Sequence, residues 1–163
     1  MTFVKAATTE VPVGRSQAEL QRLLRRYGAS AFGTSADYET GTIKVSFRVP
    51  DVPGEPATVP IRLEVQIETV RQALYRKRRG DRRSLQKERE HAERVAWRHL
   101  VLWVDAALSA ASDGVQRMSE AFLAHTLIQV ADGKVMRVVD QMNEVAGGNW
   151  KALLPASTKQ GGG

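Results

Sequence analysis

The chain has 163 residues, of which 42% are hydrophobic and 26% are charged, and it contains no cysteine. This length and composition predict one globular domain, and the lack of cysteine excludes disulfide bonds, a thiol nucleophile and a thiolate metal site. The longest mostly apolar stretch, residues 100–111, is shorter than the roughly 20 residues of a membrane span. No secretory signal is visible either, so we expect no membrane partner.

The positive charge is concentrated in one part of the chain. Residues 71–98 contain eleven basic and four acidic side chains, a net charge of +7, whereas the whole chain has a net charge of +6. The remainder of the chain is therefore close to neutral. Nine of these eleven basic residues are arginine, whose planar guanidinium favours bidentate contacts with phosphate.

The first predicted element is an amphipathic helix. Ser16 and Glu19 have the spacing of a capping box, in which both side chains bind free backbone amides at a helix start. Gly28 supplies the expected stop. The apolar stripe between them consists of Leu20, Leu23, Leu24 and Tyr27.

Alternating apolar and polar residues then predict β-strands. The alternation is clear over residues 43–49 and 59–67, and the connecting residues 50–56 are rich in proline and glycine, as turns are. Residues 32–38 are expected to add a shorter strand.

The pattern also predicts how the two longer strands pair. Placing Val49 opposite Val59 keeps both apolar sets on one face and sets Lys44 opposite Glu64, whereas a slip of one residue would oppose an apolar side chain to Glu64. Pro60 has no amide hydrogen, which indicates that its strand lies at an edge of the sheet.

The second half of the chain is predicted to be mostly helical. A short helix from Glu68 is expected to break at Gly80-Asp81 and to be followed by a long helix over residues 84–112, with Trp97 and Trp103 in the core. A further helix is expected over residues 118–125. Asp132-Gly133 predicts a tight hairpin turn, and a last helix over residues 138–145 is expected to end at Gly147.

These elements define an α+β fold class. It consists of an N-terminal helix, a small antiparallel β-hairpin sheet of two or three strands, a long basic helix and a mostly helical C-terminal half. We expect residues 1–14 to be a flexible arm, residues 15–154 to be the single domain and residues 155–163 to be a disordered tail.

The arginine-rich segment is the strongest functional signal, because so dense a positive charge suits a polyanion. We expect binding to the phosphate backbone of nucleic acid, DNA before RNA, with no cofactor. If the basic helix and the polar face of the sheet flank one groove, a positive channel follows. The expected binding residues are Lys44, Arg48, Arg62, Arg71, Arg76, Lys77, Arg78, Arg79, Arg82 and Arg83. The alternatives are a solvated face and a basic segment that docks on an acidic surface of a host protein.

A metal-dependent nuclease is a further alternative. Asp51 and Glu64-Val65-Gln66 loosely resemble the active site of the PD-(D/E)xK nucleases, with glutamine in place of lysine, and two such carboxylates can hold Mg²⁺. Glu19 could assist them. Against this, Asp51 lies in a turn-forming loop, and Lys44 is a structural partner for Glu64. The histidines His91, His99 and His125 do not have the spacing of a metal set, so we assign no catalytic residue and no metal ligand.

Several short pieces spread over most of the chain carry a resemblance. They are Tyr27-Gly28-Ala29 followed by Phe32, Arg94-x-x-Trp97-Arg98-x-Leu100, Glu120-Ala121-Phe122-Leu123, Asp132-Gly133-Lys134 and Leu153-Leu154-Pro155. In these pieces the chain resembles an uncharacterised family of small proteins encoded by actinobacterial phages and prophages. The resemblance implies a mobile-element origin and a bacterial cytoplasm, and no activity. The coarse order of elements is also similar to that of phage single-strand annealing proteins, which implies a recombination role and a homo-oligomer.

Overall fold

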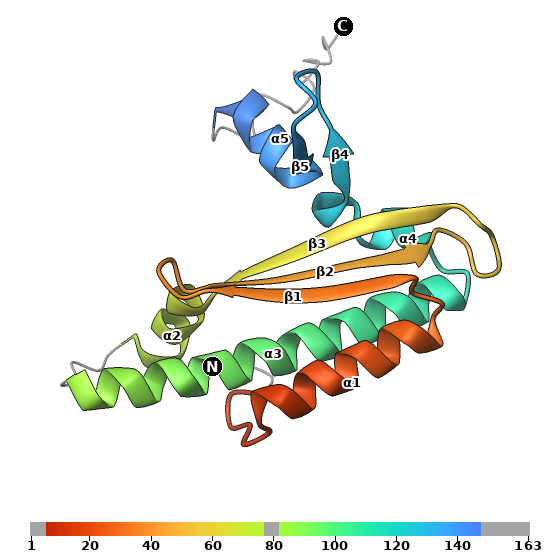
Figure 1. The fold of residues 1–163 in the computed structure, drawn as a ribbon. Coiled ribbons are helices and arrows are strands. Elements are labelled where there is room, and N and C mark those ends of the chain that lie inside the picture. Colours follow the sequence, from red (N-terminus) through yellow and green to blue (C-terminus); the bar gives the residue numbers. More distant parts are fainter. Residues whose placement is uncertain (1–5, 77–81, 148–163) are drawn as a thin grey trace, which may run out of the picture.

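The computed structural model describes residues 6–76 and 82–147, apart from the side chains of residues 82 and 83. It confirms the predicted α+β fold class, with about 50% helix and 24% strand. A three-stranded antiparallel sheet carries two helices, α1 and α3, on one face, and a small C-terminal module adjoins its β3 edge (Figure 1). The expected tail (residues 155–163) and the first five residues of the expected arm lie outside the described residues.

Helix α1 (Val13–Arg26) begins earlier than the sequence predicted. Its N-cap is Pro12, whose carbonyl accepts hydrogen bonds from the amides of Arg15 (3.1 Å) and Ser16 (3.2 Å). The predicted capping box is therefore wrong. Proline fixes a backbone angle suited to the approach to a helix, so it starts the helix upstream and places Ser16 inside the first turn, fully buried.

The end of α1 and its apolar stripe agree with the prediction. Leu20, Leu23 and Leu24 are buried. Gly28 adopts a φ of +82°, in the left-handed region, which lets the amide of Ala29 bond to the carbonyl of Leu24 at 3.0 Å.

The sheet consists of β1 (Ala31–Asp37), β2 (Thr42–Pro50) and β3 (Thr58–Gln66), in the order β1-β2-β3. The register confirms the prediction, since Val49 pairs with Val59 and Lys44 with Glu64. Strand β3 is an edge strand, as Pro60 indicated.

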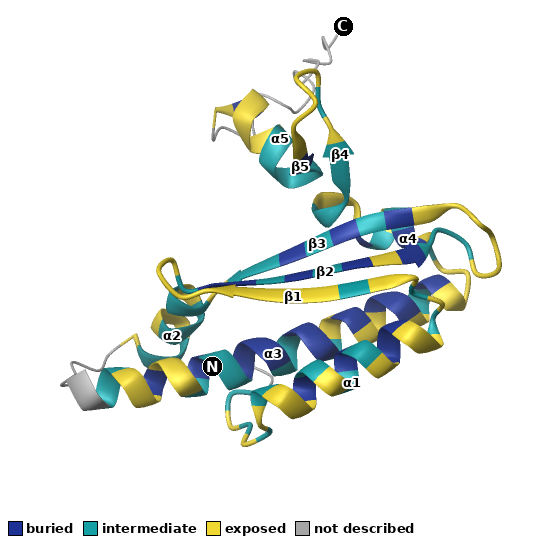
Figure 2. Ribbon diagram, viewed as in Figure 1, coloured by how far each residue is buried: buried dark blue, intermediate teal, exposed yellow. Residues whose placement is uncertain are grey.

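Helix α2 (Ile67–Tyr75) follows β3 directly, and α3 (Arg82–Ser112) is the long helix that was expected. Leucines of α1 and apolar side chains of α3 pack against the inner side chains of β2 and β3 to form the core, drawn in dark blue in Figure 2. Trp97 belongs to this core and is 2% exposed.

Trp103 corrects the prediction that both tryptophans are buried. It is 40% exposed, because α3 turns it toward the chain that follows rather than toward the sheet. There its ring makes edge contacts with Phe122 and His125, with ring centroids 5.4 Å apart in each case.

The chain after α3 forms the C-terminal module. Helix α4 (Met118–Ala121) and a 3₁₀ turn, η1 (Leu123–His125), replace the single helix that was predicted, because the backbone leaves the helical region at Phe122. The predicted hairpin is present as β4 (Leu127–Gln129) and β5 (Val135–Arg137), followed by α5 (Val138–Ala146). A bridge between Ile61 and Thr126 joins the module to the edge of β3.

Candidate nucleic-acid interface

The arginine-rich connector, residues 76–83, joins α2 to α3. Of the six predicted binding residues in it, Arg76 is described: it is exposed at the end of α2 and forms no ion pair with a described carboxylate. The other five lie outside the described residues or have side chains that do. They are Lys77, Arg78, Arg79, Arg82 and Arg83. Helix α2 ends at Tyr75 and α3 begins at Arg82, so the described residues at the two ends of the connector belong to two separate helices.

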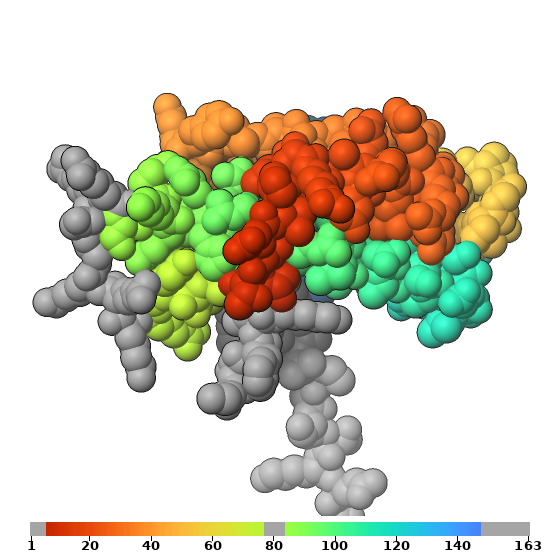
Figure 3. Space-filling view, turned by 90° about the horizontal axis from the view of Figure 1, so that it is seen from below, coloured from red at the N-terminus to blue at the C-terminus, as the bar shows by residue number. Residues whose placement is uncertain are grey.

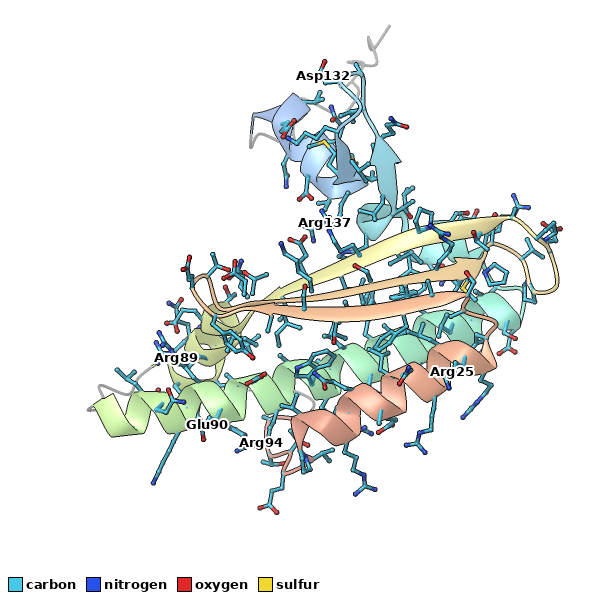
Figure 4. The ribbon with its side chains drawn as sticks, viewed as in Figure 1. Arg25, Arg89, Glu90, Arg94, Asp132 and Arg137 are labelled. Atoms are coloured by element: carbon cyan, nitrogen blue, oxygen red, sulfur yellow. The ribbon has the colours of Figure 1, made fainter. Side chains whose placement is uncertain are left out.

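The base of the connector is held by a network of ion pairs between α2 and α3. Arg71 contacts Glu68 at 2.6 Å and Glu88 at 2.9 Å, and the arginine side chain is only 15% exposed. Hydrogen bonds from Arg71 lower the pKa of Glu68 to about 2. Arg89 reaches Glu68 at 3.8 Å from the α3 side (Figure 4). A phosphate would have to break these contacts to reach Arg71. The role of Arg71 in this structure is therefore to hold α2 on α3.

An aromatic contact lies beside this network. The hydroxyl of Tyr75 is 2.5 Å from Nδ1 of His91, and the two rings meet edge to face. Tyr75 is the aromatic side chain nearest the connector in the sequence, and it is half-buried in the α2–α3 contact. Its ring therefore packs within the protein rather than standing free to stack on a base.

The three predicted residues of the sheet occupy its outer face. Because the alternate residues of β2 and β3 face the helices, Lys44, Arg48 and Arg62 point away from α3. The polar face of the sheet and α3 thus lie on opposite sides, and the predicted shared groove between them is not formed. The physical reason is the strand period of two, which sends the apolar and polar side chains to opposite faces.

The charges on this outer face are partly neutralised. Arg62 forms an ion pair with Glu64 at 2.9 Å, and Arg137 of the C-terminal module also reaches Glu64, at 3.3 Å (Figure 4). Arg48 is exposed and has no ion pair among the described residues. Lys44 also forms no ion pair with a described carboxylate, because Arg62 and Arg137 bind Glu64, but Lys44 is half-buried, so Arg48 is the most accessible of the three to an external anion.

The two carboxylates of the nuclease alternative are far apart. The amide of Asp51 bonds to the carbonyl of Ala57 at 2.9 Å, and Glu64 lies seven residues further along β3, a separation of about 23 Å. Asp51 instead accepts a hydrogen bond from the amide of Ser119 at 2.9 Å, and hydrogen bonding to the side chain of Ser119, followed by this amide, lowers the pKa of Asp51. The two cannot share a metal ion. Within residues 6–76 and 82–147, no three His, Asp or Glu side chains form a cluster that could hold one.

A second arginine-rich surface was not found by the sequence analysis. Helices α1 and α3 run side by side (Figure 3) and in the same direction, and a groove of about 600 Å³ lies between them. A 2.7 Å ion pair between Glu19 and Arg98 crosses it. The charged side chains that line it are Arg15, Glu19, Arg22, Arg26, Arg98 and Asp105. The only signal in the sequence is the helical spacing of Arg15, Arg22 and Arg26.

Comparisons with protein-family models, with curated proteins and with solved structures give no match. None of the described helices is apolar and long enough to span a bilayer.

Proposed function

We propose that the protein binds DNA without strong sequence preference, through contacts between the arginine-rich connector and backbone phosphates. The observation that carries this proposal is a charge imbalance. Residues 76–83 contain six basic side chains and one acidic one, Asp81. Glu68 and Glu88, the two carboxylates that join α2 to α3, both bind Arg71 already.

The proposed mechanism is electrostatic. Each arginine that neutralises a phosphate releases a counterion, so binding is favoured by the entropy of that release and weakens as salt is added. Arginine adds bidentate hydrogen bonds to this charge effect. No cofactor is needed. A role in phage recombination or strand annealing belongs to the same proposal, as does a bacterial cytoplasmic location.

The test compares two doubly substituted proteins with the same change in net charge. The connector variant is Arg78→Gln/Arg79→Gln, and the control is Arg117→Gln/Lys134→Gln, two exposed side chains that each make an ion pair 3.6 Å long far from the connector. We expect the connector variant to bind a random-sequence DNA duplex more weakly and with a smaller salt dependence, and the control to bind like the wild type. Equal binding by both variants would show that net charge, not the connector, is responsible.

A second candidate is supported by the surface of the C-terminal module. Val135 is 54% exposed and Val145 is 66% exposed, and Met142 on the same module is also exposed. Exposed apolar side chains in one small unit are typical of a protein contact. In this alternative the protein binds and modulates a host protein. A stoichiometric partner that copurifies after nuclease treatment, together with no affinity for DNA, would favour it over the proposal above.

A further inference from the structure

We propose that the groove between α1 and α3 is a second binding site for DNA phosphates, separate from the connector. This inference rests on the proposed function and extends it to a surface that is described throughout. The groove is concave, has arginine on both walls and has a floor that includes Leu23 and Val101.

The arginines on the α1 wall are available to a ligand. Arg15, Arg22 and Arg26 are exposed, and none of them forms an ion pair with a carboxylate in the described part of the chain. Arg98 on the opposite wall is bound to Glu19, which cancels that carboxylate's repulsion of an anion. Asp105, exposed at the far end of the groove, is the remaining negative charge in its lining.

The helix dipole favours Arg26, which lies in the last turn of α1, but it does not account for Arg15 or Arg22. Arg22 and Arg26 are four residues apart, where like charges destabilise a helix. Arg15 lies in the first turn, at the positive end of the helix dipole, and that turn contains no acidic residue. Arg15 and Arg22 thus occupy positions that the helix itself disfavours for a positive charge, and an anion bound in the groove would explain them.

The length of the row indicates an extended polyanion rather than a compact ligand. Arg15 and Arg26 are eleven residues apart, or about 16 Å along the helix axis. One strand of a DNA duplex presents about five phosphates over that distance. A single small phosphate compound would reach only part of the row.

The groove is separate from the connector. Arg98 lies about 22 Å along α3 from Arg83, the last residue of the connector. Between them lies a hollow whose charged lining consists of Glu10, Glu90, Glu93 and Arg94, so its net charge is negative and it interrupts the positive surface. We therefore expect two separate contacts with one DNA molecule.

The experiment measures duplex DNA binding as a function of salt for matched variants of the full chain. The groove variant is Arg22→Gln/Arg26→Gln. The control is Arg25→Gln/Arg117→Gln, because Arg25 is an exposed neighbour on the same helix that does not line the groove (Figure 4). We expect the slope of log affinity against log salt to be shallower by about 2 in the groove variant than in the wild type. Between roughly 50 and 200 mM salt, the fold loss of affinity should therefore be about ten times smaller for the groove variant than for the wild type. The control should keep the wild-type slope.

Asp105→Asn gives a test with the opposite sign. Removal of this exposed carboxylate from the groove should tighten DNA binding, a gain that partial unfolding could not produce. Equal slopes for the groove variant and the control, with no gain from Asp105→Asn, would overturn this inference. If the Arg78→Gln/Arg79→Gln variant still lost affinity in that case, DNA binding through the connector would stand without the groove site. If the wild type bound no DNA, the proposed function and the groove site would both be overturned.

Discussion

Arg71 on α2 donates a hydrogen bond from Nη1 to Oε2 of Glu88 on α3 over 2.9 Å, and Glu88 is only 4% exposed. The pair connects the two helices on either side of the arginine-rich connector. A buried carboxylate is stable only while its partner remains, because an unpaired charge in the interior loses its hydration without compensation. This contact therefore holds together α2 and α3, the two helices that the connector joins.

Replacing Arg71 with methionine should lower the free energy of unfolding by about 3–5 kcal/mol, because Glu88 is then left buried and unpaired. The double variant Arg71→Met/Glu88→Leu should recover most of that loss, since it removes both charges. Denaturant unfolding of the three proteins measures this. If the single variant were as stable as the wild type, the ion pair would not hold α2 on α3.

Glu68 should make the protein sensitive to acid. Its pKa in the folded protein is about 2, lowered from 4.5 mainly by the hydrogen bonds from Arg71. A carboxylate with a lowered pKa contributes stability that is complete above pH 4.5 and is lost as the pH falls toward 2. Glu68→Gln should flatten the pH dependence of the thermal midpoint in this window. An unchanged profile would contradict the assignment.

His125 should have its effect at a higher pH. Burial lowers its pKa below 6.5, and the nearby Arg137 adds to the effect. Because the unfolded chain then binds the proton more readily, stability should fall as the pH drops below 6.5. His125→Phe keeps the ring contact with Trp103 and removes the buried Nδ1 that has no hydrogen-bond partner within the described residues. This variant should be at least as stable and should lack the slope in thermal melts.

Asp51 is predicted to be a structural residue. Its carboxylate caps the start of α4 through the amide of Ser119, so Asp51→Ala should lower the free energy of unfolding by about 0.5–2 kcal/mol. Mg²⁺ should not change the thermal midpoint of the wild type, because Glu64 is too distant to share an ion. If Mg²⁺ raised the thermal midpoint of the wild type but not that of Asp51→Ala, the nuclease alternative would be restored.

The sheet could be predicted from the sequence in detail. Two alternating strands and a proline-rich loop admit one register that buries both apolar sets, and Pro60 marks the edge of the sheet. The start of α1 was harder to predict. Pro12 and Ser16 can each serve as the N-cap of this helix, and sequence spacing does not show which of them does. Glu19 then became free to bind Arg98 across the groove.

The candidate site was harder to predict because it depends on how elements meet. A list of arginines does not say that Arg71 is bound by two carboxylates, one of them on another helix. The groove between α1 and α3 exists because residue 19 lies against residue 98, an offset that no local pattern contains. The charge of a segment was readable, whereas the pairing of its individual side chains required the fold.

The salt dependence of DNA binding by the wild-type protein tests the central claim most directly. Six basic residues in the connector, each neutralising one phosphate, predict a slope of log affinity against log salt of about −5 for a duplex and about −4 for a single strand, and contacts in the groove would steepen it. A slope near zero, or no binding to either strand type at low salt, would contradict the account.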